Sequence, residues 1–76
     1  MTPLRQVRLL LGMRQSDVAA AAGLARQTIS LLEAGVRSPH LKNAVAISKV
    51  LGCDVGALWP ELFYPAGDDQ EGGADA

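Results

Sequence analysis

Apolar residues recur every three to four positions along most of the chain, which is the spacing of helices packed on one core. At the start, Thr2 and Pro3 are typical of an N-cap followed by the first helical residue, and Gly12 can end a helix in the left-handed conformation. The stripe predicted to face the core in this first helix consists of Leu4, Val7, Leu10 and Leu11.

Two short helices follow, from about Gln15 to Ala22 and from about Arg26 to Ala34. Gly23 separates them, and Gly35 stops the second. Apolar residues again mark the sides that face the core. These are Val18, Ala19 and Ala22 on the earlier helix, Leu24 in the turn, and Ile29 and Leu32 on the later helix.

A loop broken by Pro39 leads to a fourth helix, from about Leu41 to Leu51, which Gly52 ends. Its predicted core residues are Leu41, Ala44, Ile47 and Leu51. Asp54 is a plausible N-cap for a last short helix that passes through Leu58 and stops before Pro60. Neither alternating patterns nor hairpin dipeptides occur, so the sequence predicts an all-α domain of five helices over residues 1–65, followed by an acidic flexible tail, residues 66–76.

Composition limits the partners and excludes several classes of function. A chain of 76 residues has material for one core. Up to Pro60 it holds seven basic and three acidic residues, whereas the remainder holds five acidic residues and no basic one. A basic body of this kind is compatible with a polyanionic partner even though the formal net charge of the whole chain is -1.

Sites for metals, cofactors or catalysis are not indicated. Cys53 and His40 have no second Cys or His to complete a zinc set, and neither an acidic pair at a defined catalytic spacing nor a glycine-rich phosphate loop is present. We therefore expect no enzyme, no cofactor and no small-molecule ligand. No apolar run approaches the length of about 20 residues that spans a membrane, and a cytoplasmic location is expected.

The third helix carries a polar face that the core does not use. Opposite Ile29 and Leu32, at about 100° per residue, lie Arg26, Gln27, Ser30 and Leu31. Arginine can pair with guanine, glutamine with adenine, serine with either, and leucine with a thymine methyl group. A solvated helix face is the plain alternative, but an apolar Leu31 pointing outward and the spacing of the two helices both favour a DNA-reading unit.

From Leu4 to Trp59 the sequence resembles the phage-repressor-like helix-turn-helix family, the Cro/C1 or xenobiotic-response-element type. The resemblance is carried by the stretches LRQVRLLLGMRQSDVA, GLARQTISLLEAG, SP and AISKVLGCDVGALW. It implies a five-helix lambda-repressor-like fold with the helix-turn-helix at helices 2 and 3. It also implies a transcriptional regulator that binds double-stranded DNA, with Arg26–Ala34 as the recognition helix in the major groove.

The resemblance also implies individual roles. Gln15 would contact phosphate and support the first base-reading residue, and Arg8 would pair with Glu33 as a partly exposed structural ion pair of about 0 to 1 kcal/mol. Phosphate contacts are expected from Arg14, Gln15, Thr28, Arg37 and Lys42. The sequence departs from the family at the two helix caps, where Arg14 and Ala25 replace Ser or Thr and where Asp17 or Thr28 could compensate locally, and at Ala34, where Asn is frequent.

One helix reads only a few base pairs, so a homodimer on an inverted repeat is expected, acting as a repressor. The candidate dimer interface consists of Val50, Trp59, Leu62, Phe63 and Tyr64. Folding of the aromatic segment back onto the small core is an equal alternative. A second function stays open as well, a protein-interaction module such as an antitoxin or an anti-repressor, and the tail could either confer solubility or compete with DNA for the basic face.

Overall fold

Residues 2–62 are described by a computed structural model, which is all-helical over that range. This confirms the predicted all-α class. The end of the predicted domain, its Phe63 and Tyr64, and the predicted tail lie outside the described residues. The elements are α1 (Pro3–Leu10), α2 (Gln15–Ala22), α3 (Arg26–Glu33), α4 (Leu41–Leu51), α5 (Val55–Leu58) and a 3-10 helix, η1 (Pro60–Leu62).

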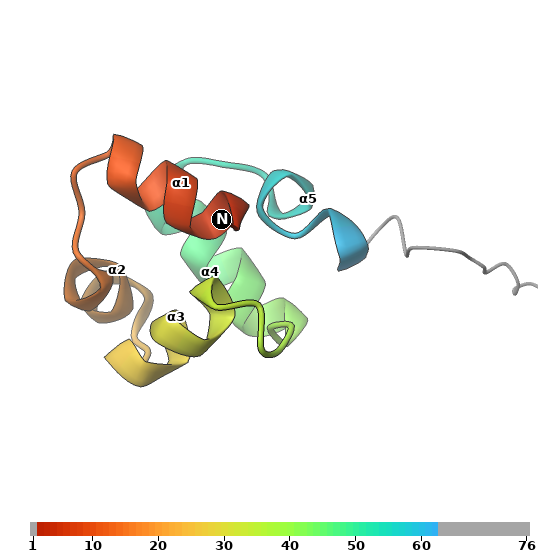
Figure 1. The fold of residues 1–76 in the computed structure, drawn as a ribbon, viewed down its shortest axis with the longest axis horizontal. Coiled ribbons are helices and arrows are strands. Elements are labelled where there is room, and N and C mark those ends of the chain that lie inside the picture. Colours follow the sequence, from red (N-terminus) through yellow and green to blue (C-terminus); the bar gives the residue numbers. More distant parts are fainter. Residues whose placement is uncertain (1, 63–76) are drawn as a thin grey trace, which may run out of the picture.

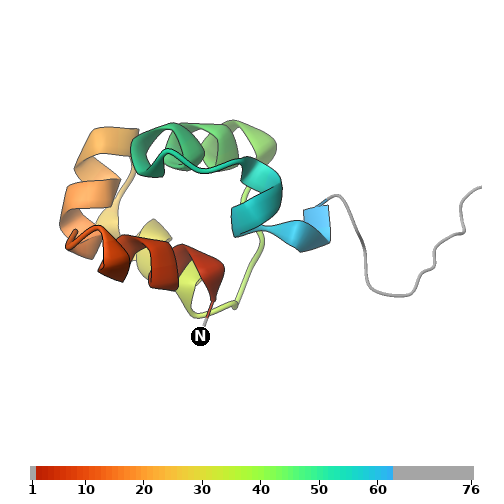
Figure 2. The same cartoon turned by 90° about the horizontal axis from the view of Figure 1, so that it is seen from above.

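The helices surround one core (Figures 1 and 2). Seen from above, α1 and α4 lie on opposite sides, α2 closes one end and α5 closes the other (Figure 2). Contacts of α2 with α3 and α4, and of α5 with α1 and α4, complete the enclosure. Ten buried apolar residues fill it: Leu4, Val18, Ala19, Ile29, Leu32, Ala44, Ile47, Leu51, Leu58 and Trp59.

The helix starts differ in how they are capped. The Thr2 hydroxyl accepts a hydrogen bond from the Arg5 backbone N–H at 3.4 Å and donates to the Glu33 carbonyl at 2.9 Å, which joins the start of α1 to the end of α3. At α2, the Asp17 carboxylate accepts from the Arg14 backbone N–H at 2.9 Å, which supplies the reciprocal half of a capping box, although no side chain caps the first turn itself. At α3, Ala25 has no side chain that can accept, and the structure shows no substitute from Thr28.

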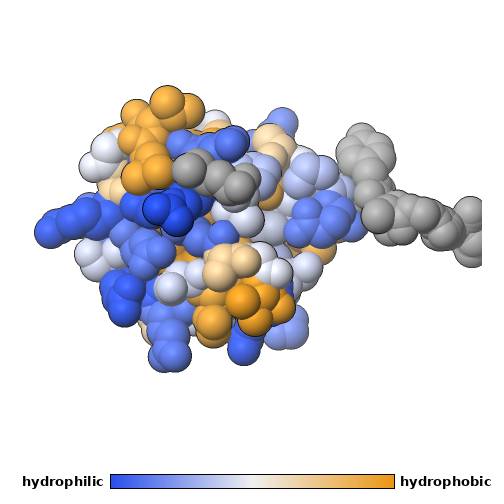
Figure 3. Space-filling model, viewed as in Figure 1, coloured by the Kyte–Doolittle hydropathy of each residue, from blue (hydrophilic) through white to orange (hydrophobic). Residues whose placement is uncertain are grey.

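The predicted core stripe of α1 is partly wrong. Leu4 is fully buried and Val7 packs against the core, but Leu10 and Leu11 are 85% and 52% exposed. Arg8 takes the inward position, one turn after Leu4. With Leu9, the two exposed leucines form an apolar patch over the end of α1 (Figure 3).

One further expectation fails, at the start of α4. Leu41, the first residue of that helix, is exposed. Ser48 is buried instead, and its hydroxyl is satisfied because it donates to the Val45 carbonyl at 2.8 Å. The last helix agrees with the prediction, since α5 ends at Leu58, before Pro60. Pro60 then begins η1, where a residue without an N–H is tolerated.

Candidate nucleic-acid interface

The first residues of α2 and α3 lie side by side. Arg26 Nη1 donates a hydrogen bond to Gln15 Oε1 at 3.0 Å. Gly23, at φ 73°, closes α2 in the left-handed conformation and allows the chain to turn directly into α3. Since a helix carries partial positive charge at its N-terminus, this arrangement places two such ends and one guanidinium together.

Gln15 connects Arg26 to the interior. Its Nε2 donates to Glu33 Oε1 at 3.1 Å while its Oε1 accepts from Arg26. A carboxylate only accepts and a guanidinium only donates, so one amide orientation alone satisfies both neighbours. The orientation of Gln15 is therefore fixed chemically, and Arg26 is held through it.

Glu33 also belongs to a buried, two-point ion pair with Arg8. Arg8 Nε and Nη2 both donate to the Glu33 carboxylate, the latter at 3.0 Å, and Arg8 Nη1 donates to the Met13 carbonyl at 2.8 Å. The two side chains are only 10% and 4% exposed, so the expectation of a partly exposed pair is wrong. The hydrogen bond from Arg8 to Glu33 raises the pKa of the Arg8 guanidinium, against the opposing effect of burial.

Burial changes what this pair contributes. Removing one partner from a buried pair leaves an uncompensated charge and costs about 3–5 kcal/mol, far more than loss of a surface pair. The pair also fixes α1 against α3, because Arg8 and Glu33 come from those two helices. The scaffold behind Gln15 and Arg26 is thus held by directional, charged hydrogen bonds.

The predicted base-reading residues differ in exposure. Arg26 and Gln27 are exposed, whereas Ser30 and Leu31 are half-buried. Leu31 is not among the residues that pack against the core, in agreement with its predicted outward position. The helix predicted for recognition, α3, is one residue shorter than expected, since Ala34 is its C-cap.

The residues predicted to contact phosphate differ in their exposure and in their hydrogen bonds. Arg14 is paired with Asp17, with Nη2–Oδ1 and Nε–Oδ2 distances both 3.1 Å. The hydrogen bond from the Arg14 side chain lowers the pKa of Asp17 most, and the hydrogen bond from the Arg14 backbone lowers it further. Arg37, in the α3–α4 loop, and Lys42, on α4, are exposed, and Thr28 is half-buried. Within residues 2–62, none of these last three is hydrogen-bonded to the Gln15–Arg26 pair.

Sequence reasoning missed the Gln15–Glu33 contact and the Met13 carbonyl that Arg8 binds. Gln15 and Glu33 are 18 positions apart, and no periodicity links them. A useful signal was the presence of a basic residue in the middle of the α1 stripe, since a charge on a core face needs a partner.

Of the candidate dimer residues, Trp59 is only 4% exposed and belongs to the core. Val50 and Leu62 are half-buried and pack against that core. For Trp59 and Leu62 the structure therefore shows the folded-back alternative, and a direct dimer contact by Trp59 is not compatible with its burial. A role for Val50 and Leu62 stays a prediction.

The described part of the chain lacks both a metal-binding cluster and a membrane-spanning helix. Residues 2–62 bring no three potential metal ligands together. No helix in this range has the length and apolar character needed to cross a bilayer.

Most of the described chain matches a known sequence family. Residues 4–58 match the family model described as Helix-turn-helix, HTH_3. The chain belongs to this helix-turn-helix family, the Cro/C1 type. The match includes α1 to α5 almost entirely, so both the helix-turn-helix of α2 and α3 and the helices that support it fall within the family.

A curated relative agrees with this assignment. The chain is similar to a protein of Archaeoglobus fulgidus described as "Uncharacterized HTH-type transcriptional regulator". The two are 34% identical over 70 residues, which cover 92% of this chain and 91% of the relative. No solved structure was found to match the chain.

Proposed function

We propose that this helix-turn-helix protein is a transcriptional regulator that binds a specific double-stranded DNA sequence with α3 in the major groove. The observation that carries the proposal is the pair of adjacent helix N-termini, with Arg26 exposed and held by Gln15. A helix with its side chains is about 10–12 Å across, which suits a groove about 12 Å wide. The family and the description of the A. fulgidus relative support the same function.

The geometry of Arg26 favours guanine. Its Nη1 is engaged by Gln15, which leaves the edge formed by Nε and Nη2 for a bidentate pair with O6 and N7 of guanine. Because Gln15 restricts the guanidinium before DNA arrives, less side-chain entropy is lost on binding. Gln27, exposed beside it, is suited to adenine, while Ser30 and Leu31 contribute smaller contacts from a half-buried position.

Phosphates would be bound around this reading unit. Gln15 has a second amide N–H beyond the one donated to Glu33, and the uncapped start of α3 leaves backbone N–H groups available. Arg14 can reach a phosphate while sharing its charge with Asp17. Thr28, Arg37 and Lys42 complete the set we propose.

A single recognition helix reads few base pairs, so we propose that two copies bind an inverted repeat with their recognition helices about 34 Å apart. Bound over a promoter, such a dimer would act as a repressor. Val50 and Leu62 are the described residues we propose for the dimer contact, together with Phe63 and Tyr64, which lie outside the described range.

Selection of bound duplexes from a random pool tests the whole proposal. We expect enrichment of one half-site containing guanine, present as an inverted repeat, and retention that falls steeply with salt because bound phosphates release counterions. Enrichment of a single half-site would contradict the proposed dimer but would support sequence-specific DNA binding by one chain. No enriched sequence and no salt-dependent retention would contradict DNA binding and favour a protein-interaction module.

A further inference from the structure

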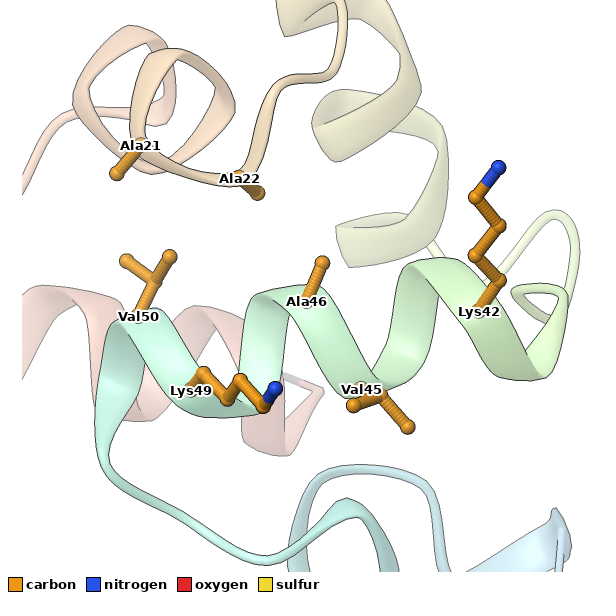
Figure 4. Close-up of a pocket in the computed structure, with 7 residues that line it drawn as sticks. All are labelled: Ala21, Ala22, Lys42, Val45, Ala46, Lys49 and Val50. Carbon is orange, nitrogen blue, oxygen red and sulfur yellow. The ribbon is translucent and has the colours of Figure 1, made fainter.

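A shallow groove of about 440 Å³ lies between α2 and α4, away from the Gln15–Arg26 pair (Figure 4). It is lined by Ala21, Ala22, Lys42, Val45, Ala46, Lys49 and Val50. In Figure 4, Ala22 points toward α4, while Ala46 and Val50 point toward α2. The small alanine side chains leave this apolar floor open to solvent rather than filled.

The charged groups at the groove are both positive. Lys42 and Lys49 are seven residues apart on α4, about two turns, and so lie on the same side of that helix about 10 Å from each other along it. Within the described range neither lysine forms an ion pair. Of the described acidic residues, Asp17 is bound to Arg14 and Glu33 to Arg8, so these two carboxylates are already satisfied.

The chain itself contains a segment with the matching chemistry. Residues 63–76 begin with Phe63 and Tyr64, and their charged residues are all acidic: Asp68, Asp69, Glu71 and Asp75. The 14 residues can extend up to about 46–50 Å, more than the 40 Å longest dimension of the fold. The described chain ends at η1, which packs against α5, and α5 packs against α4, so one short helix separates the end of the described chain from the helix that carries both lysines.

We propose that residues 63–76 dock into the α2–α4 groove of their own chain. The aromatic side chains cover the apolar floor at Ala46 and Val50, and the carboxylates that follow neutralise Lys42 and Lys49. Such docking weakens as salt rises, because exposed charges are screened beyond about 10 Å at 0.1 M. Resting on the proposed function, it has two consequences. The segment occupies Lys42, a proposed phosphate contact, and so lowers the affinity for nonspecific DNA. It also covers Val50 and engages Phe63 and Tyr64, so docking belongs to the single chain without DNA and is released when the proposed dimer contact forms.

A spin label tests the docking without DNA. The full-length chain with Cys53→Ala and Gly72→Cys carries a nitroxide at position 72, and amide NMR signals are compared with those of the reduced label at low salt. We expect loss of signal at Ala21, Ala46 and Val50, with signals of α1 such as that of Gln6 retained. Equal effects on both regions, or none on the groove, would overturn the proposal.

Matched charge reversals show whether the lysines hold the segment. Lys49→Glu, which removes no proposed DNA contact, should restore the groove signals. Arg5→Glu makes the same change in net charge on exposed α1 and should leave the broadening in place. Broadening that persists in Lys49→Glu would contradict the charged contact.

The same label distinguishes one chain from two. Isotope-labelled chain without nitroxide is mixed with unlabelled chain that carries it. We expect no loss of signal in the groove of the isotope-labelled chain. Loss there would show that the segment of a second copy fills the groove, which overturns docking within one chain.

The DNA consequence is measured separately on the full chain, with Asp68, Asp69, Glu71 and Asp75 changed to their amides. This variant should bind a random duplex about tenfold more tightly at low salt, in the lower range of effects that charged surfaces have on local concentration. Unchanged affinity would remove the competition. If neither protein bound any duplex, the proposed function would fail, while the spin-label result would still decide the docking.

Discussion

Helices α1 and α3 have the same length and are joined by one ion pair. The helical spacing of apolar residues nevertheless predicts the buried side chains of α3 well and those of α1 poorly. In α3, Ile29 and Leu32 are buried, and Arg26 and Gln27 on the opposite face are exposed, as the spacing predicts. In α1, the inward stripe contains Arg8, and Leu10 is the most exposed large apolar residue of the described range. The difference arises because Arg8 is buried against a specific partner, Glu33, which the pattern of apolar residues does not predict.

This comparison separates two ways of positioning a helix. Apolar burial is non-directional, so it fixes which face of α3 is inside but tolerates small rotations. A two-point guanidinium–carboxylate contact is directional and fixes the rotation of both helices. Glu33 also orients Gln15, and Gln15 accepts a hydrogen bond from Arg26, the proposed reading residue. The ion pair therefore helps to position Arg26.

The largest expected effect comes from breaking the ion pair. Glu33→Ala should lower the free energy of unfolding by about 3–5 kcal/mol, because the buried Arg8 charge loses its partner. For a domain with about 5–15 kcal/mol in total, urea denaturation would detect this easily. The double variant Arg8→Met with Glu33→Leu is the control and should recover most of the loss. A loss below about 1 kcal/mol for the single variant would mean that the pair behaves as a surface pair.

Within α1, Leu4 and Leu10 should respond in opposite ways. Leu4→Ala should cost about 2–5 kcal/mol, since it leaves a cavity in the core. Leu10→Ala should change stability by no more than about 0.5 kcal/mol, because that side chain is 85% exposed. Thermal unfolding of the two variants compares them directly. Equal losses of stability would mean that Leu10 contributes to the core, as the sequence pattern predicted.

How much the sequence predicts follows from this contrast. Helix bounds were accurate to within about a residue where glycines and caps mark them, as at Gly23 and Gly52, because those signals are local. The two adjacent N-termini follow from the short turn between α2 and α3. By contrast, the burial of Arg8 depends on residue 33, and the core position of Trp59 depends on the small size of the whole core, which no local pattern contains.

A smaller effect is expected at the uncapped start of α3. Ala25 has the extended backbone of an N-cap but no acceptor, so Ala25→Ser should stabilise the protein by about 1 kcal/mol. Ala34→Ser, at the C-cap, offers no such gain and is the matched control. Urea midpoints would show the difference, and equal midpoints would mean that the backbone N–H groups at the start of α3 are already satisfied by water at no cost.

The smallest effect concerns pH at the start of α2. Arg14 lowers the folded-state pKa of Asp17 below its ordinary 3.8, so this contact stabilises the fold above that pH. The contribution is lost as the pH falls through the lowered pKa. An NMR titration of the Asp17 carboxyl should show a midpoint below 3.8 that rises in Arg14→Ala. A midpoint unchanged by that substitution would show that the guanidinium does not act on it.

The central claim, that α3 reads bases through a prepositioned Arg26, is tested most directly by binding of Arg26→Ala to the selected duplex and to its single-base-pair variants. We expect a loss of about 1–3 kcal/mol on the selected site and no remaining preference at one base pair, with Leu10→Ala unchanged in both. Full affinity together with full selectivity in Arg26→Ala would contradict the account.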